Sequence, residues 1–289
     1  MSANITPSWK KLGDPAPDSL TESRKQLHWA AQAVASVGHT LIKAVPDYNH
    51  TSLVWLEAQE VLAGQPANFP REFRAAIRPA GLVLMLIEPQ GEPIAETPLK
   101  GRTLKQALEW LASAIGKYTG QALTAALETP GYELPPHPAG DGAPFGAAHK
   151  EALPELARWY ANAAALLGDL VARTPGASPV RCWPHHFDIA TVIELDAGVS
   201  GEDAPNVGVG MSPGDGSYPE PYWYVTPWPY PENPNLPDLP GGGRWNREDW
   251  VGAILTGSAS TSGDAQAQAE QVTIFIDAAV AACRELGGG

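Results

Sequence analysis

The chain has 289 residues, of which 44% are hydrophobic, so it can bury a full core. Its formal net charge of -13 excludes nucleic acids and anionic membranes as expected partners, because both need a clustered basic face. The N-terminus lacks an apolar secretion signal and two cysteines are too few for a disulfide framework, so we expect a cytoplasmic protein.

The first predicted element is an amphipathic helix. Residues Ser19 to Glu22 match a capping box, and apolar residues recur at helical spacing until the stop at Pro46. His28, Gln32 and His39 lie at steps of four and seven residues. Both imidazoles are therefore expected on one side of this helix, next to its apolar stripe.

Short extended runs separated by Gly and Pro follow, and they predict a meander of antiparallel strands. These runs are Ser52 to Glu57, Phe73 to Arg78, Leu82 to Glu88 and Pro93 to Leu99. Thr103 is expected to start a second helix. Residues 130–146, rich in Pro and Gly and without periodicity, predict a connector between an N-terminal half, 1–129, and a C-terminal half, 147–289.

The C-terminal half repeats the order of the first: a helix from about 148 to 173, then strands, then a helix from about 264 to 286. The strands are expected at Val180 to Leu195, Asn206 to Met211, Pro221 to Thr226 and Trp250 to Thr256. The predicted fold class is therefore α+β, with two similar halves of helix, antiparallel meander and helix, and with helices covering the sheet faces. No residue-level repeat accompanies this duplication.

The segment Trp183-Pro-His-His-Phe-Asp188 carries the strongest candidates for chemistry. In an extended strand successive side chains alternate faces, so His186 and Asp188 would point one way and His185 the other. Histidine and aspartate are common zinc ligands, and a catalytic ion needs three or four of them. His50 and His28 are candidates for the missing ligands. The alternative is that these histidines are core or rim residues bonded to main chain.

An acidic region surrounds this segment, since residues 182–243 contain Asp and Glu but no Lys or Arg. Such a region attracts cations, although carboxylates also line ordinary solvated loops. Ser212-Pro-Gly-Asp215 has the residue order of a type II turn, which makes Asp215 a candidate ligand or general base. The glycines nearby do not have the spacing of a dinucleotide site, so we expect no nucleotide cofactor.

An aromatic strand follows Pro221. Tyr222 and Tyr224 are expected on one face and Trp223 on the other, with one face in the core. The outer face, together with Trp228, would form an aromatic wall suited to a ring-shaped ligand, and Trp183 is a further candidate for substrate binding. The alternative is an ordinary aromatic core beneath a Pro-rich strap.

The stretch Ser178-Pro-Val-Arg-Cys-Trp-Pro-His-His-Phe-Asp-Ile-Ala190, the turn Gly210-Met-Ser-Pro-Gly214 and the aromatic strand resemble the bacterial domain-of-unknown-function family five-nine-nine-six. The likeness spans most of the chain and includes His28, His50 and Asp188. That family has Gly-Ser where this chain has His185-His186, so the histidine pair is not implied. The resemblance implies a fold and an important cleft, but no reaction.

Two functions follow as hypotheses. The first is a metal-assisted hydrolase of a small neutral or cationic substrate; the second is a non-enzymatic module that binds a ligand on the aromatic wall. Whether the protein is an enzyme, and its oligomeric state, stay open. In the hydrolase, one divalent ion, most simply zinc, would be held by His186, Asp188, His50 and His28, with His185 and Asp215 in catalysis. A metal-free variant would use His186 as base, oriented by Asp188.

Overall fold

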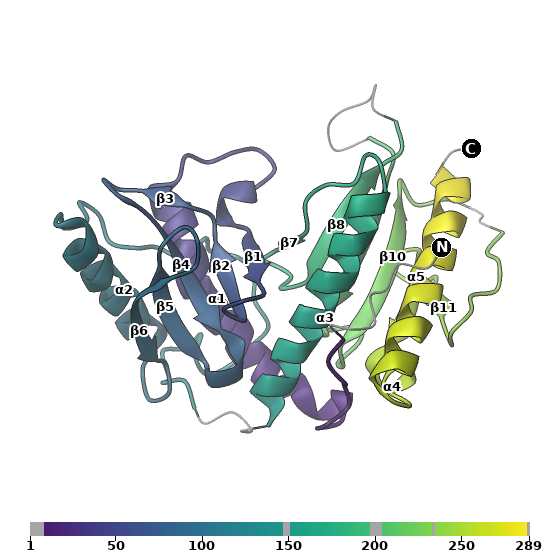
Figure 1. Ribbon diagram of the computed structural model, residues 1–289, viewed down its shortest axis with the longest axis horizontal. Helices are drawn as coiled ribbons and strands as arrows, with labels where there is room; N and C mark the ends of the chain where they lie inside the picture. The colour runs from purple at the N-terminus through teal and green to yellow at the C-terminus, as the bar shows by residue number, and fades with distance from the viewer. Residues whose placement is uncertain (1–8, 147–150, 197–203, 233–234, 288–289) are drawn as a thin grey trace. The chain divides into compact units, whose positions relative to one another are not determined.

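A computed structural model describes residues 9–146, 151–196, 204–232 and 235–287 (Figure 1). The chain forms two compact units, neither of which is continuous in sequence. Unit 1 contains the residues up to 19, then 158–180 and those from 188 onward, and unit 2 contains 20–157 and 181–187. The predicted connector, 130–146, is part of unit 2.

Unit 2 contains an antiparallel sheet in the order β7-β1-β2-β4-β5-β6, with β3 paired to β4, and the helices α1 and α2. Its strands are β1 (Leu53–Leu56), β2 (Val61–Gly64), β3 (Ala67–Asn68), β4 (Glu72–Arg78), β5 (Val83–Ile87), β6 (Pro93–Pro98) and β7 (Arg181–Cys182), and its helices are α1 (Thr21–Leu41) and α2 (Leu104–Thr119). All predicted strands of the first half are present, and β2 and β3 are additional.

The starts of the two helices differ from each other in their capping. Thr103 caps α2 with a complete capping box, in which its hydroxyl accepts from the Gln106 nitrogen and the Gln106 side chain accepts from the Thr103 nitrogen. The box predicted for α1 is wrong. The 3-10 helix Pro17–Leu20 leads directly into α1, and the Ser19 hydroxyl donates to the carbonyl oxygen of Ala16 instead.

Two glycines allow the backbones of unit 2 to approach α1 closely. A Cβ atom on Gly38 of α1 would lie 2.1 Å from the carbonyl oxygen of His50, and one on Gly64 of β2 would lie 3.2 Å from Val34 of α1. Helix α1 is therefore packed closely against β2 and the short 3-10 helix Asn49–Thr51, and His28 on this helix is buried.

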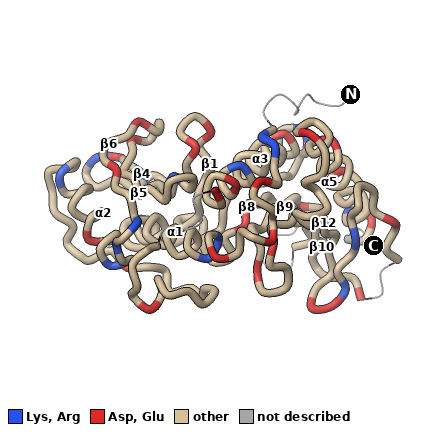
Figure 2. The backbone as a smooth tube through the Cα atoms, turned by 90° about the horizontal axis from the view of Figure 1, so that it is seen from below, with Lys and Arg blue, Asp and Glu red and all other residues tan. Residues whose placement is uncertain are grey.

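Unit 1 contains an antiparallel sheet in the order β11-β12-β10-β9-β8. Figures 1 and 2 show α3 and α5 along one face of this sheet. The elements are β8 (Ile189–Glu194), β9 (Asn206–Ser212), β10 (Tyr222–Trp228), β11 (Arg244–Asn246), β12 (Gly252–Thr256), α4 (Gly257–Ser260), α5 (Ala265–Gly287) and the part of α3 (Ala152–Arg173) from residue 158 onward. The α+β class predicted from the sequence is confirmed. None of the described helices is long and apolar enough to cross a membrane.

The core of unit 1 lies between the sheet and its helices. Trp223 of β10 is fully buried there, with its ring centroid 5.9 Å from that of Trp9 and 6.1 Å from that of Trp159 on α3. Its neighbour two positions on, Val225, is also fully buried. The predicted alternation along β10 is confirmed, and the tyrosines of this strand consequently point to the opposite face.

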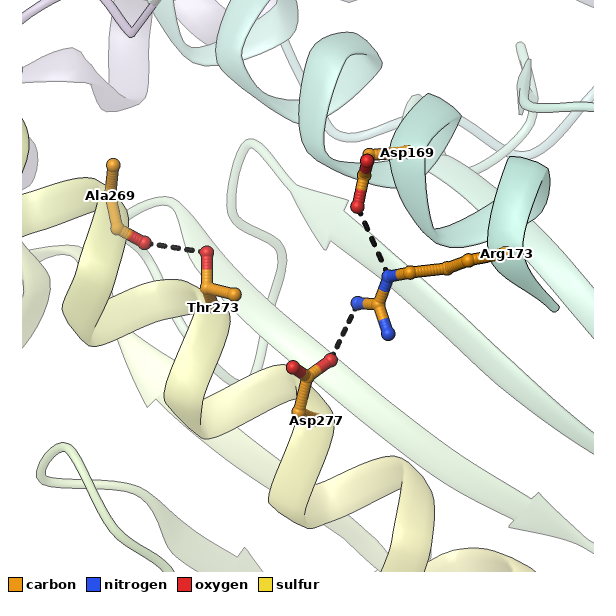
Figure 3. Close-up of polar contacts among 5 residues, drawn as sticks. All are labelled: Asp169, Arg173, Ala269, Thr273 and Asp277. Carbon is orange, nitrogen blue, oxygen red and sulfur yellow. Dashed lines mark hydrogen bonds and ion pairs between the residues drawn. The ribbon is translucent and has the colours of Figure 1, made fainter. Parts of the chain in front are cut away.

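An arginine joins the two helices that cover this sheet (Figure 3). The Arg173 guanidinium at the end of α3 donates to Asp169 on its own helix at 3.0 Å and to Asp277 on α5 at 2.6 Å. On α5, one turn before Asp277, the Thr273 hydroxyl donates to the carbonyl oxygen of Ala269. The ion pairs are partly exposed, so their main effect is to fix the end of α3 against the middle of α5 rather than to add much stability.

Candidate functional site

The segment from Trp183 to Asp188 forms a tight turn, where the sequence predicted extended strand. The main-chain nitrogen of Phe187 donates to the carbonyl oxygen of Trp183 at 2.6 Å, and Phe187 adopts a left-handed φ of 62°. Pro184 has no N–H to give to a sheet ladder, which explains why strand pairing stops here. The predicted alternation of faces along this segment is therefore wrong.

Helix α1 holds this turn in place. Two side chains one helical turn apart meet the carbonyl oxygen of Pro184: the His28 Nε2 lies 2.9 Å from it, and the Gln32 Nε2 donates to it at 2.8 Å. The His28 ring also lies parallel to the Phe187 ring, with centroids 4.9 Å apart. These contacts use the shared side of α1 that the sequence predicted for His28 and Gln32.

His28 is consequently a structural, neutral imidazole. Its side chain is only 3% exposed, and burial lowers its pKa to about 4, against the opposing effect of the bond to Pro184. His50 is also buried, and its Nδ1 accepts a hydrogen bond from the Val45 nitrogen at 3.3 Å. Each of these proposed metal ligands therefore already has one ring nitrogen engaged by main chain.

His185 and His186 contact aromatic rings rather than main-chain hydrogen-bonding groups of the described residues. Their ring centroids lie 4.5 Å apart, and the His185 ring lies 5.4 Å from Tyr132 and 6.1 Å from Trp183. His186 is exposed and His185 is half-buried, and burial together with the neighbouring His186 lowers the pKa of His185 to about 4. Within the described part of the chain, neither imidazole has a hydrogen-bond partner.

The predicted ligand set is divided between the two units. His28, His50 and His186 belong to unit 2, whereas Asp188 belongs to unit 1. Among the residues that the structure describes, no group of three or more His, Cys, Asp or Glu side chains is arranged to hold a metal ion.

Asp188 takes part in a second cluster, on the face of the unit 1 sheet opposite the helices. The Tyr224 hydroxyl donates to Asp188 Oδ2 at 2.5 Å, and the Tyr222 hydroxyl donates to Asp215 Oδ2 at 2.5 Å. The two tyrosine rings lie 6.2 Å apart. We call these four residues the tyrosine–aspartate row. It joins two residues predicted as substrate-binding to one predicted metal ligand and one predicted catalytic residue.

Small residues on β9 form the floor beneath the row. Tyr222 pairs with Ser212 and Tyr224 with Gly210 in the register between β10 and β9. A Cβ atom on Gly210 would lie 2.6 Å from the Tyr224 hydroxyl oxygen and 2.8 Å from the Ile189 carbonyl oxygen. The Tyr224 ring therefore lies across β9 in space that only a glycine leaves open, and this directs its hydroxyl toward Asp188 at the start of β8.

Asp215 both fixes Tyr222 and shapes the turn that precedes it. Its Oδ1 accepts from the main-chain nitrogens of Ser217 and Tyr218, and its Oδ2 accepts from Tyr222. Gly214 has the positive φ predicted for this turn. Burial and the adjacent Asp215 carboxylate raise the pKa of Tyr222, so this phenol stays protonated and donates.

The aromatic residues beside the row are not the ones that the sequence predicted for the wall. Trp228 lies at the far end of β10, is 37% exposed, and contacts Tyr230 edge to face. Tyr218, which was not among the residues predicted for the wall, packs against Tyr222 with the ring centroids 5.0 Å apart and the ring planes inclined by 52°. The run Asp215-Gly-Ser-Tyr218 is typical of a turn closed by an aspartate side chain, and that signal would have placed Tyr218 beside the row.

Figure 2 shows acidic positions on the loops next to β8, β9 and β10. Comparison of the whole chain with protein-family models, curated proteins and solved structures finds no match. Function is therefore inferred from the geometry of the two clusters alone.

Proposed function

We propose that the protein binds a small ring-shaped ligand that carries hydrogen-bond donors, and that the tyrosine–aspartate row is its recognition surface. The observation that carries this proposal is the pair of bonds Tyr224–Asp188 and Tyr222–Asp215, made side by side on one sheet face. Each tyrosine ring is held by a carboxylate, so the orientation of the row is fixed before a ligand arrives.

The ligand class follows from the chemistry of the row. Ionised carboxylates only accept hydrogen bonds, so they favour hydroxyl or amine groups over acidic ones. Aromatic faces favour a flat or ring-shaped body, as in sugar and aromatic-ligand sites. The glycine and serine floor on β9 leaves these groups close to the backbone. A neutral or cationic ring with several donors satisfies all three conditions.

The test is a ligand screen by saturation-transfer NMR with monosaccharides, inositol and aromatic amines, each compared with its hydroxyl-free or amine-free analogue. A hit should weaken about ten-fold in Tyr224→Phe or Asp188→Asn, because one charge-assisted bond is lost. Tyr230→Phe, a partly exposed tyrosine of the same unit, should leave binding unchanged. A hit unaffected by Tyr224→Phe and Asp188→Asn would place the ligand elsewhere and reject the proposal.

A second candidate is the metal-assisted hydrolase, favoured by one specific observation. The adjacent imidazoles of His185 and His186 have no hydrogen-bond partner in the described chain and lie in a cluster with Trp183. A divalent ion, most simply zinc, would be held by His186 and Asp188 with the remaining nitrogens of His50 and His28, while His185 and Asp215 would move protons.

Elemental analysis and zinc titration test this second candidate. About one equivalent of zinc, lost in His186→Ala and kept in His39→Ala, is expected, since His39 is an exposed histidine on α1. Binding of less than about a tenth of an equivalent by the unaltered protein would reject the hydrolase while leaving the ligand-binding proposal intact.

Three broader expectations belong with these proposals. The helix, meander and helix order of the two sequence halves supports an internal duplication, and the motif likeness supports kinship with the family five-nine-nine-six. Cys182 and Cys283 are both buried free thiols, which supports a reducing, cytoplasmic location. A pairwise superposition of experimentally determined halves would test the duplication.

A further inference from the structure

Beyond the tyrosine–aspartate row, unit 1 has a surface hollow of about 500 Å³ at its edge strand β11. We call it the β11 hollow. Its walls come from Tyr218, in the turn before β10, and from residues 244–250. The hollow contains two arginines, Arg244 and Arg247, although residues 182–243 before them contain no Lys or Arg at all.

The hydrogen-bond donors of these two guanidinium groups are not engaged by the described residues. Arg244 lies over the Tyr218 ring, with its Cζ 5.4 Å from the ring centroid, and Arg247 is exposed in the following turn. Among the residues that the structure describes, neither forms an ion pair or a side-chain hydrogen bond. Their donors are consequently available to a bound group.

The walls around the arginines are fixed in place. The Asn246 Oδ1 accepts from the Tyr218 hydroxyl at 2.9 Å, and its Nδ2 donates to the Trp250 carbonyl oxygen at 2.7 Å. One amide therefore ties both sides of the hollow together. A Cβ atom on Gly252 would lie 2.1 Å from the Trp250 ring, so the indole is packed directly onto the β12 backbone.

We propose that the β11 hollow binds an aromatic monocarboxylate, whose carboxylate pairs with Arg244 and Arg247 and whose ring packs on Tyr218 and Trp250. Arginine presents a planar fork that matches a carboxylate, and aromatic walls favour a flat ring. Glu248 and Asp249 also line the hollow, so its formal charge is balanced and a single negative charge is favoured over a dianion. The hollow adjoins the tyrosine–aspartate row, since its wall residue Tyr218 packs against Tyr222, but the hollow favours an acid whereas the row favours donors.

The test uses phenylacetate as probe, phenylacetamide as its uncharged match and phenyl phosphate as a dianion, followed by saturation-transfer NMR. Phenylacetate should bind, and it should bind about ten-fold more weakly to Arg244→Gln or Arg247→Gln, since a charged hydrogen bond is lost in each. Both arginines are exposed, so these variants should keep the parent circular dichroism spectrum. Phenylacetamide and phenyl phosphate should bind more weakly than phenylacetate.

Two further variants serve as controls for the place of binding. Arg284→Gln changes an exposed arginine of α5 that lines a different hollow in unit 1, and Tyr224→Phe changes the row. Both should bind phenylacetate like the parent. Three outcomes would each overturn the proposal: equal binding of phenylacetate and phenylacetamide, loss of binding in Arg284→Gln, or full binding by both Arg244→Gln and Arg247→Gln. None of these outcomes depends on whether the tyrosine–aspartate row binds a ligand.

Discussion

The Nε2 atom of His28 lies 2.9 Å from the carbonyl oxygen of Pro184, a residue 156 positions further along the chain. This contact ties the Trp183 to Asp188 turn to α1. Because the imidazole is buried, its pKa is lowered to about 4, below the ordinary value of 6.5. The turn is therefore coupled to pH through His28.

The first prediction concerns this coupling. Between pH 6.5 and about 4 the unfolded chain protonates His28 while the folded protein does not, so stability is fully present above this window and falls as pH falls through it. The unfolding free energy of the parent protein should fall between about pH 7 and about pH 5, and in His28→Gln this fall should be smaller by about 2 kcal/mol.

Urea unfolding at both pH values measures this difference. His185→Gln should act in the same direction and less strongly, since the pKa of His185 is also lowered to about 4 but its ring is half-buried. His39→Gln, at an exposed position of α1, should follow the parent curve. A His28→Gln curve parallel to the parent would show that His28 titrates normally in the folded protein.

The second prediction concerns the floor of the tyrosine–aspartate row. Gly210→Ala should lower the unfolding free energy by about 1–3 kcal/mol, because the new methyl group would overlap the Tyr224 ring and the Ile189 carbonyl. Gly216→Ala is the control, since its Cβ would meet no atom within 4 Å, and it should change stability by less than about 0.5 kcal/mol. Equal stabilities of the two variants would contradict the packing described for Tyr224.

The third prediction uses two helical glycines with opposite surroundings. Gly168 of α3 is exposed and its Cβ would meet nothing within 4 Å, so Gly168→Ala should stabilise the protein by about 0.5–1 kcal/mol. Gly38→Ala on α1 should destabilise it, since that Cβ would lie 2.1 Å from the His50 carbonyl oxygen. Thermal unfolding of both variants checks the signs, and a stabilising Gly38→Ala would refute the close contact of α1.

The fourth prediction concerns the link between α3 and α5 in Figure 3. A double-mutant cycle of Arg173→Ala and Asp277→Ala should give a coupling free energy of about 0.2–1 kcal/mol, because the pair is partly exposed. The coupling should shrink in about 1 M salt, where charges are screened within about 3 Å. A coupling that salt does not change would indicate packing rather than charge.

The sequence predicted most elements with strong periodicity. The Thr103 cap and the last helix were placed within two residues of their observed ends. The strands β2, β3 and β11 were missed because each is short and lacks alternation; β11 lies beside a Pro- and Gly-rich loop and is defined only by its pairing to β12. Such strands depend on their partners rather than on their own residues.

The candidate site was predicted as single residues and not as pairs. Tyr222, Tyr224, Asp188 and Asp215 were all named, but their pairing depends on the register of β8, β9 and β10, which the sequence does not fix. The histidine segment was predicted as extended, since its residues have no strong turn preference apart from Pro184. The left-handed Phe187 is held by the stacked His28 ring, a tertiary contact that local rules do not capture.

The division of the chain into units has a practical consequence for genetic dissection. The polypeptide moves between the units at residues 19/20, 157/158, 180/181 and 187/188. A fragment that ends at the Pro- and Gly-rich stretch 130–146 would omit residues 181–187, which supply β7 and the Pro184 carbonyl oxygen that contacts His28. The complementary fragment would lack Trp9, which packs against Trp223 in unit 1. No single cut in the chain yields either unit whole, so a fragment that keeps one unit intact must also carry segments of the other.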